Sequence, residues 1–312
     1  MVDRIGAGPK PRQGWTSLGY GVQVLGDASD DLSARLQAWQ LVLPYWSSFT
    51  GLTAAALRGW WLPPLPPGLP LFVAAGRSDR IRRPELRECR HDTVPEADRV
   101  SGVRVTTPAE TILALARDLS LLDVVVIGDA ALHCGDATID QLRTVSRKRR
   151  RGSPLMRRAI PMMDPRAESI YEGLLRVLHR VCGVAVQPQY DLVDEHGIFV
   201  ARADLWLVGT ARFAEYDGAT HLLRAQQRHD LRRTGRIADA GFERRGYTQE
   251  DVLHSGVTIL RDADRALGRP HEARRIAAWH DLLRASLFTP QGRARAAARW
   301  RLPPENAEEI PG

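Results

Sequence analysis

The sequence predicts an α/β protein in which a mixed sheet flanked by helices is preceded by a smaller α+β domain. Three observations support this prediction. The chain has 312 residues, a length that suits two domains. In its second half, a strand hairpin is followed by a helix, a strand and a further helix, an order typical of a mixed sheet with helical cover. Between the halves, a run of positive charge leads into Gly152 and Pro154, which favours a domain boundary there.

The composition is that of an ordinary globular protein, with 44% hydrophobic and 26% charged residues. The longest apolar runs are interrupted by acids and are too short to span a bilayer. The N-terminus lacks the apolar core of a signal peptide. We therefore expect a cytoplasmic protein with no membrane partner, in which Cys89, Cys134 and Cys182 remain thiols.

The net charge of +7 indicates a polyanionic partner without establishing one. All but two of the 44 basic residues are arginines, a bias that also fits a GC-rich coding sequence. The distribution of charge is therefore more informative than its total.

The first 30 residues are rich in Gly, Pro and polar side chains, so we expect a weakly ordered segment with one strand-like stretch at 19–24. A helical stripe begins at Leu32 and is expected to end or bend at Pro44. A short helix at 53–57, an extended proline-rich connection at 63–70, and strands at 71–75 and 103–106 follow.

Three helices close this domain. Thr107, Pro108 and Glu110 have the spacing of an N-cap, a first helical residue and a capping box. Ser120 is expected to cap a second helix that ends near His133, and Thr138 begins a third. The α+β domain is thus assigned to residues 31–146, and a basic linker to 147–163.

The linker begins with the densest positive run in the chain. Such a run is either a solvated connection or a contact for phosphates, and the sequence leaves both open. The residues concerned are Arg147, Lys148, Arg149, Arg150 and Arg151.

The second domain is expected over residues 164–262. Asp164 and Pro165 are typical of a helix start, and this helix should run to about Val181. Strands are expected at 184–187, 190–193 and 242–247, and helices at 221–240 and 248–253. Residues 263–312 are assigned to a C-terminal helix, at about 271–287, and a basic tail.

The hairpin of this domain lies in VARADLWLVGTARFAEYDGATH, residues 200–221. Gly209 and Thr210 suit a two-residue loop, because Gly supplies the positive φ of a type II′ turn. Counting back from that loop puts Asp204 opposite Glu215. Because side chains alternate between faces, one face would carry Asp204, Trp206, Phe213, Glu215 and Asp217.

Opposed carboxylates repel each other unless a cation lies between them. The alternative is that these acids are simply solvated on an open face. Trp206 and Phe213 would form an aromatic pair on the same face, which argues against an open one. Glu168 and Glu172, four apart on the preceding helix, either join this group or merely complement the helix dipole.

Together, these residues resemble the restriction-endonuclease-like PD-(D/E)XK superfamily, in the branch similar to very-short-patch-repair endonucleases. The resemblance covers residues 164–262. It rests on Glu168 on the leading helix, Asp204 in ARADLWLVG, Glu215, Asp217 and His221 in EYDGATH, and the RHDLRR stretch at 228–233.

The resemblance implies that Asp204 and Glu215 bind a catalytic Mg²⁺, for which Mn²⁺ can substitute, and that Glu168 assists. Asp217 occupies the position of the superfamily's lysine and cannot supply its charge. The related branch also lacks that lysine and has a histidine downstream, so His221 becomes the candidate for proton transfer. DNA would be held along its backbone by the basic run at 147–151 and by Arg224, Arg228 and Arg232.

The first domain resembles antitoxin-type regulators of the AbiEi class. The resemblance rests on SFTGLTAAALRGWWLPP, RHDTVP and VSGVRVTTPAETILALA, and it implies a toxin or defence-system partner. Those regulators begin with a winged helix, of which residues 1–24 would retain only the tail.

Two functions therefore follow as expectations. The first is a Mg²⁺-dependent DNA endonuclease with little sequence readout. The second is a catalytically inactive, antitoxin-like DNA-binding regulator, which Asp217 favours. A protein-interaction scaffold is a third.

Overall fold

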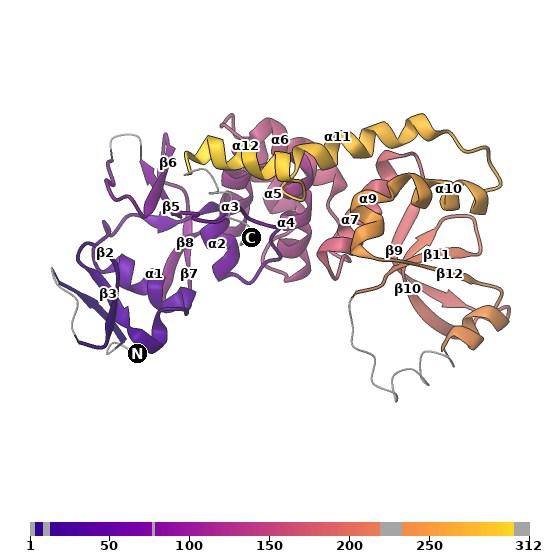
Figure 1. The fold of residues 1–312 in the computed structure, drawn as a ribbon, viewed down its shortest axis with the longest axis horizontal. Helices are drawn as coiled ribbons and strands as arrows, with labels where there is room; N and C mark the ends of the chain where they lie inside the picture. Colours follow the sequence, from indigo (N-terminus) through magenta and orange to yellow (C-terminus); the bar gives the residue numbers. More distant parts are fainter. Residues whose placement is uncertain (1–3, 9–12, 77–78, 219–232, 303–312) are drawn as a thin grey trace, which may run out of the picture. The chain divides into compact units, whose positions relative to one another are not determined.

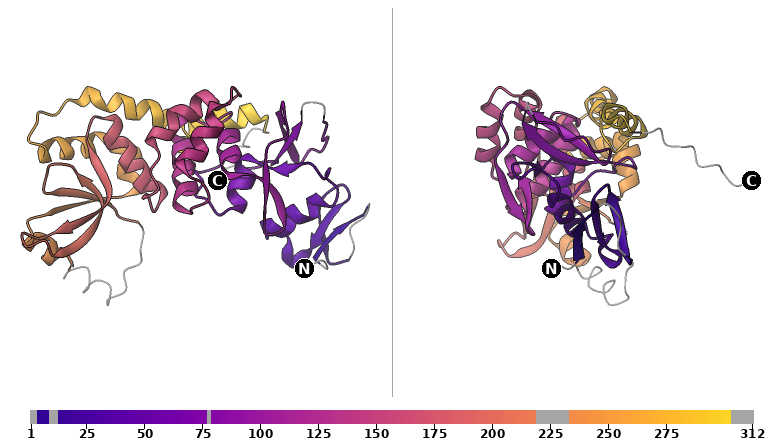
Figure 2. Two further views of the ribbon diagram at one scale, coloured as in Figure 1. Left: turned by 180° about the vertical axis from the view of Figure 1, so that it is seen from behind. Right: turned by 90° about the vertical axis from the view of Figure 1, so that its left-hand side faces the viewer.

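The structure is a computed structural model that describes residues 4–8, 13–76, 79–218 and 233–302. The chain forms two compact units (Figures 1 and 2). Unit 1 comprises Met1–Leu119, Asp136–Arg158 and Arg295–Gly312, and unit 2 comprises Ser120–Gly135 and Ala159–Ala294. Both units contain helices and strands, which confirms the α/β class. The division differs from the expected boundaries, because residues 120–135 group with unit 2.

Unit 1 begins with a three-stranded antiparallel sheet, drawn in indigo in Figure 1. Its strands are β1 (Ile5–Ala7), β2 (Trp15–Gly19) and β3 (Val22–Leu25), in the order β1-β3-β2. Val22 and Val24 are buried and pack in one cluster with Leu36 and Trp39 of α1 (Leu32–Gln40). The described residues of this segment, 4–8 and 13–30, thus contain regular structure that was not expected there, because apolar side chains at alternate positions of β3 pack against α1.

The main sheet of unit 1 has five strands in the order β6-β5-β4-β8-β7. The pairs β5–β6 and β4–β8 are parallel, and the other two pairs are antiparallel. The strands are β4 (Ser48–Phe49), β5 (Leu71–Gly76), β6 (Leu86–His91), β7 (Ala97–Val100) and β8 (Val103–Thr106). The helices are α2 (Gly51–Leu57), α3 (Pro108–Leu115), α5 (Ile139–Arg147) and α6 (Ser153–Ala159).

Helix α3 begins at Pro108 as expected, but the predicted capping box at its start is absent. The side chain of Thr107 makes no capping hydrogen bond, and Glu110 is buried with 3% of its side chain exposed. Glu110 instead accepts a hydrogen bond from Arg150 at 2.7 Å. Leaving a buried carboxylate without a charged partner costs more free energy than leaving one backbone N–H at the helix start without a cap. The ion pair with Arg150 is therefore formed in place of the capping box.

Unit 2 contains a four-stranded mixed sheet in the order β12-β11-β10-β9. The strands are β9 (Val186–Val193), β10 (Phe199–Leu207), β11 (Arg212–Tyr216) and β12 (Glu243–Tyr247). Neighbouring strands are antiparallel from β9 to β11, whereas β11 and β12 are parallel. Helix α7 (Ile170–Val181) precedes the sheet in the chain, and residues 233–239, just ahead of β12, are helical.

The remaining helices of unit 2 lie before α7 and after β12 in the chain. Helix α4 (Leu121–His133) is capped by Ser120 as expected, and Asp123 completes a capping box with it. The C-terminal region holds α9 (Gln249–His254), α10 (Gly256–Ala266), α11 (Ala277–Ala285) and α12 (Pro290–Trp300), which passes from unit 2 into unit 1. Short 3₁₀ turns occupy Gly26–Ala28, Ile160–Met162 and Ala273–Ile276. Much of the predicted tail is thus the helix α12.

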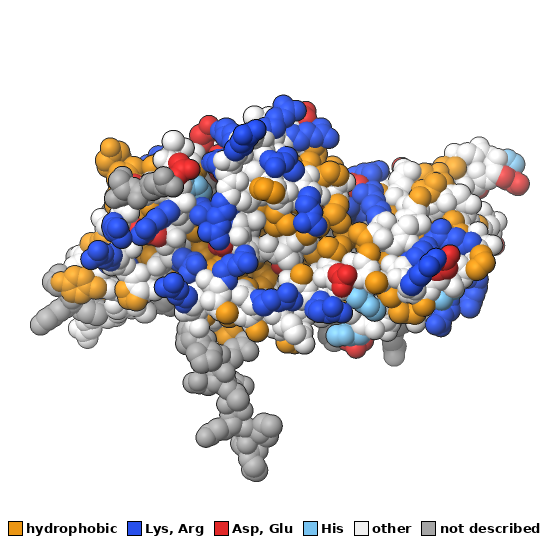
Figure 3. Space-filling view, turned by 90° about the horizontal axis from the view of Figure 1, so that it is seen from above, with side chains coloured by type: hydrophobic (Ala, Val, Ile, Leu, Met, Phe, Trp, Pro, Cys, Tyr) orange, Lys and Arg blue, Asp and Glu red, His pale blue; other side chains and the backbone are white. Residues whose placement is uncertain are grey.

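On the face drawn in Figure 3, Lys and Arg side chains are more numerous than acidic ones. Within the part of the chain that the structure describes, no helix combines the length and apolar character needed to cross a membrane.

Candidate functional site

The site begins with the hairpin formed by β10 and β11. Trp206 pairs with Phe213, and Leu205 pairs with Ala214, so the same register places Asp204 opposite Glu215 as predicted. The loop is longer than expected, because β10 ends at Leu207 and β11 begins at Arg212. Gly209 has a φ of 82°, but it occupies the second central position of a turn closed by a hydrogen bond from Thr210 N to Leu207 O. That is the position where a type II turn, and not the predicted type II′ turn, needs glycine.

A row of residues crosses the whole sheet at Asp204. The flanking pairs of β9 and β10 place Gln189 beside Asp204, and Glu215 pairs with Gly246 of β12. Gln189 has a φ of 48°, in the left-handed region that non-glycine residues seldom occupy and that costs about 1 kcal/mol or more. Strain of this kind concentrates at functional sites, and here it falls in the row that contains Asp204 and Glu215.

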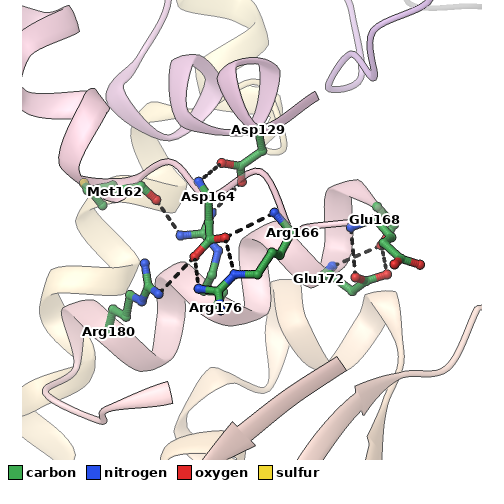
Figure 4. Close-up of polar contacts among 9 residues, drawn as sticks. Asp129, Met162, Asp164, Arg166, Glu168, Glu172, Arg176 and Arg180 are labelled. Carbon is green, nitrogen blue, oxygen red and sulfur yellow. Dashed lines mark hydrogen bonds and ion pairs between the residues drawn. The ribbon is translucent and has the colours of Figure 1, made fainter. Parts of the chain in front are cut away.

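Helix α7 adds a third carboxylate to this row. Gln189 donates a hydrogen bond from Nε2 to Oε2 of Glu172 at 3.1 Å. The same carboxylate accepts from the Ser169 hydroxyl and from the main-chain N of Glu168. Glu168 itself is exposed and lies ahead of the helix (Figure 4). The acid that α7 brings to the sheet is therefore Glu172, whereas the sequence favoured Glu168.

The start of α7 explains this exchange. The helix is capped by Ser169, which accepts from Glu172 N, and not by Asp164 as predicted. The carboxylate of Asp164 instead pairs with Arg166 at 3.0 Å and with Arg180 at 3.3 Å (Figure 4). Asp164 also accepts from Arg166 N at 3.2 Å, but this bond lies ahead of the helix, which begins at Ile170.

A buried ion pair holds α7 against α4. Asp129 of α4 and Arg176 of α7 are each 1% exposed and hydrogen-bonded to each other. Asp129 also accepts from Asp164 N at 2.8 Å, and Arg176 donates to the carbonyl of Met162 (Figure 4). Gly173 permits the approach, because a Cβ there would lie 2.9 Å from Asp129 Oδ2. This contact fixes the helix that carries Glu172.

Asp204 is partly buried close to two other acids. Burial raises its pKa to about 7, with contributions from the negative charges of Glu172 and then Glu215. A hydrogen bond from Tyr216 N to Asp204 Oδ2, at 3.1 Å, partly opposes this effect. A carboxyl group that shares its surroundings with two others is a site where a divalent cation replaces a proton favourably.

Glu215 has a different environment. It is 5% exposed and hydrogen-bonded to Arg233 and to Arg244, one guanidinium on each side. Burial opposes its ionisation, but these two partners outweigh burial and leave its pKa below the ordinary value. Glu215 is therefore ionised at neutral pH, with its charge balanced by arginines.

Asp217 lies just past the end of β11 and shares Arg244 with Glu215. Its main-chain N donates to Tyr247 O at 2.9 Å. Gly246 accommodates the Asp217 side chain, because a Cβ at that position would lie 1.8 Å from Oδ2. Positive charge is thus present beside position 217, but it comes from Arg244 on the neighbouring strand.

Aromatic rings flank the row of acids. Tyr171 of α7 stacks on Tyr216 of β11 with ring centroids 4.8 Å apart. Trp206 stacks on Tyr190 at 4.3 Å, while its register partner Phe213 is fully buried. Trp206 and Phe213 are thus cross-strand neighbours as predicted, but the ring that stacks on Trp206 is that of Tyr190.

The residues fit a divalent cation only in part. Asp204 and Glu172 offer oxygens whose ionisation is disfavoured, as expected of ligands that await a cation. Glu215 offers its oxygens only if Arg233 or Arg244 releases them. In agreement with this, no group of three or more His, Cys, Asp or Glu side chains is close enough to hold a metal within the described ranges.

The predicted nucleic-acid contacts are divided between described and undescribed residues. Arg147, Lys148 and Arg149 are exposed, and Arg151 makes only a long pair with Asp118, at 3.9 Å. Arg150 is engaged by the buried Glu110, so its charge is part of the fold of unit 1. His221, Arg224, Arg228 and Arg232 lie outside the residues that the structure describes.

Two residues of the site, Gln189 and Arg244, had no role in the prediction, and Arg233 entered it only as part of an arginine-rich stretch. Arg244 stands beside Phe213 through the parallel pairing of β11 and β12, which no local pattern reveals. Gln189 precedes the expected strand at 190–193 and gave no signal beyond its polarity. Arg233 lies in the RHDLRR stretch, so the arginine content of that stretch was the one available hint.

Comparison with protein-family models, with curated proteins and with solved structures found no match to this chain.

Proposed function

We propose that the protein is a Mg²⁺-dependent DNA endonuclease, with its active site on the β10–β11 hairpin of unit 2. The observation that carries this proposal is the convergence of Asp204, Glu215 and Glu172 from two strands and one helix. Arg233 and Arg244 already balance the charge of Glu215, so a cation would be needed at Asp204 and Glu172, whose ionisation is disfavoured.

The order of elements supports the same proposal. A helix, an antiparallel meander of three strands and a fourth strand parallel to the third form a mixed sheet with the acids on its inner strands. We propose that this arrangement is the restriction-endonuclease-like fold that the sequence resembles. The relation of unit 1 to AbiEi-type regulators, and a toxin or defence-system partner, belong to the same proposal.

In this scheme Asp204 and Glu172 hold the Mg²⁺, and Glu215 joins them when an arginine releases it. The metal would activate water and stabilise the charge that develops on the scissile phosphate. Arg233 and Arg244, once free of Glu215, would pair with phosphate oxygens of the strand. Such contacts go to the backbone, so little sequence would be read.

Cleavage of supercoiled plasmid tests the proposal. The wild-type chain should nick DNA in Mg²⁺ or Mn²⁺ and stop in EDTA, and Asp204→Asn should lower the rate by at least about 100-fold, since it removes a metal ligand. Asp281→Asn is the matched control, because Asp281 is an exposed acid on α11. Cleavage by Asp204→Asn at the rate of the control would exclude this active site.

A second function is favoured by one observation. Glu215 is fully engaged by two arginines, and Arg244 also holds Asp217, which is how a site without a metal would be neutralised. The chain would then be an inactive DNA-binding regulator. It would retain DNA in EDTA and bind neither Mg²⁺ nor Mn²⁺.

A further inference from the structure

A second polar site lies in unit 1, apart from the acids of unit 2. A cavity of about 990 Å³ is lined by residues of α1, β5 and β6 and by residues 299–302 at the end of α12. None of its residues belongs to the proposed metal site, so the two proposals can be tested independently of each other.

The lining of this cavity is dominated by positive charge. Three acids line it, of which Glu88 already pairs with Arg90 and Asp118 makes a long pair with Arg151. Besides Arg90, the lining includes six arginines: Arg35, Arg87, Arg117, Arg151, Arg299 and Arg301.

Two of these arginines are fixed in place without being neutralised. Arg87 donates to the main-chain carbonyls of Trp300 and Arg299, at 2.9 and 3.1 Å. Arg299 donates to the carbonyls of Arg117 and Asp118, at 3.2 and 2.8 Å. A carbonyl orients a guanidinium group but does not cancel its charge, so both cations remain available to an anion.

Arg117 also contacts an uncharged group, which is a histidine ring and not a carbonyl. Its Nη1 lies 3.4 Å from Nε2 of His91, which is buried. Burial, followed by the charges of Arg117 and Arg150, lowers the pKa of His91 to about 4. His91 is therefore a neutral acceptor at physiological pH. No carboxylate lies within ion-pair distance of Arg87, Arg117 or Arg299 anywhere in the described residues.

Donors and apolar surface complete the cavity. Trp300 is 4% exposed and packs edge-on against Phe72, and its Nε1 has no hydrogen-bond partner among the described atoms. The same holds for Nε of Arg35. Apolar side chains that include Leu18, Ile81 and Leu86 form another part of the lining. The cavity thus joins a cationic part to an apolar part.

We propose that this cavity binds a nucleotide phosphate, with Arg87, Arg117 and Arg299 on the phosphate and the apolar part against the nucleoside. The planar fork of a guanidinium group matches phosphate oxygens, and preorganised cations lose little entropy on binding. The phosphate belongs either to a free nucleotide or to a nucleic-acid strand, which share this chemistry.

Titration of the full-length protein in EDTA tests the proposal. The probes are inorganic phosphate, adenosine 5′-monophosphate and a short, fluorescein-labelled single-stranded DNA. Binding of the first two is measured by calorimetry and binding of the DNA by fluorescence anisotropy. The double variant Arg87→Gln/Arg299→Gln should weaken binding by at least about 10-fold, as expected for the loss of charge-assisted hydrogen bonds. Arg35→Gln/Arg301→Gln should weaken it as well, because both side chains line the cavity.

The control is Arg99→Gln/Arg143→Gln, which removes the same charge from exposed positions of unit 1. Tight binding of the monophosphate points to a free nucleotide, and tight binding of DNA with weak binding of the monophosphate points to a strand. Equal loss in the cavity and control variants would overturn the proposal. The proposal would also be overturned if none of the three phosphate probes bound at millimolar concentration. This holds even if another polyanion, such as a poly-glutamate peptide, bound to the protein.

Discussion

At the scale of single residues, the site depends on how Asp204 and Glu215 differ. The two acids stand opposite each other in one hairpin, yet Asp204 has a pKa near 7 while that of Glu215 is lowered. The difference arises from their partners, because Asp204 faces carboxylates and one N–H whereas Glu215 faces two arginines. Asp204 is therefore the residue at which a cation should exert the largest effect.

This difference predicts a pH dependence of stability in the absence of metal. The pKa of Asp204 is about 7 in the folded chain and about 3.9 when unfolded, so the folded state binds the extra proton between these values. The free energy of unfolding should therefore fall as pH rises from about 4 through 7. Asp204→Asn mimics the protonated acid and cannot ionise. Its free energy of unfolding relative to the wild type should therefore increase by at least about 1 kcal/mol when the pH is raised from 4.5 to 8. Urea unfolding in EDTA measures this, and a constant difference across that range would contradict the environment described for Asp204.

Arg244 predicts a competition between arginine and metal for Glu215. Arg244→Met should raise the affinity for Mn²⁺ about fivefold, since about 1 kcal/mol of ion pairing no longer opposes the metal. The same change should lower DNA cleavage, because a phosphate contact is lost. Arg245→Met is the control, since Arg245 is the next residue and pairs with Glu243. Weaker Mn²⁺ binding in Arg244→Met than in Arg245→Met would show that Arg244 supports the metal and does not compete with it.

At the scale of elements, the contact between α4 and α7 positions the site. Removing one partner of a buried ion pair leaves an uncompensated charge, so Arg176→Met should cost about 3–5 kcal/mol of unfolding free energy. Asp129→Leu/Arg176→Met should recover much of this loss, because no buried charge remains. Arg180→Met should cost less than about 1 kcal/mol, since the pair of Arg180 with Asp164 is partly exposed. Denaturant unfolding of the three variants checks this ranking, and equal losses for Arg176→Met and Arg180→Met would contradict it.

The elements also show what the sequence could predict. The register of the hairpin was predicted even though the loop was not, because extending a loop by one residue on each side keeps the same pairs together. The start of α7 was missed because Ser169 caps the helix, whereas Asp164 accepts from Arg166 N and pairs with Arg166 and Arg180 ahead of it. Local signals are reliable where no long-range partner competes for the same side chain.

At the scale of the whole molecule, two units of mixed α/β structure follow from the length and the order of elements, as predicted. The sequence segments that make up each unit were not predicted, because α4 lies between two segments of unit 1 but belongs to unit 2. The buried pair of Asp129 with Arg176 is part of that grouping, and such a pair over 47 positions leaves no local pattern. The role of Arg244 could not be predicted for the same reason. Its strand, β12, pairs in parallel with β11, which is distant from it in the sequence.

The central claim is that the acids of unit 2 bind a divalent cation through Asp204. Calorimetric titration of Mn²⁺ into the metal-free full-length chain tests it most directly, with Asp204→Asn and Asp281→Asn measured in parallel. We expect one site in the wild type and in Asp281→Asn, tighter at pH 8 than at pH 6 because Asp204 must lose its proton, and at least about 10-fold weaker binding in Asp204→Asn. The absence of binding to the wild type, or equal binding to all three proteins, would contradict the claim.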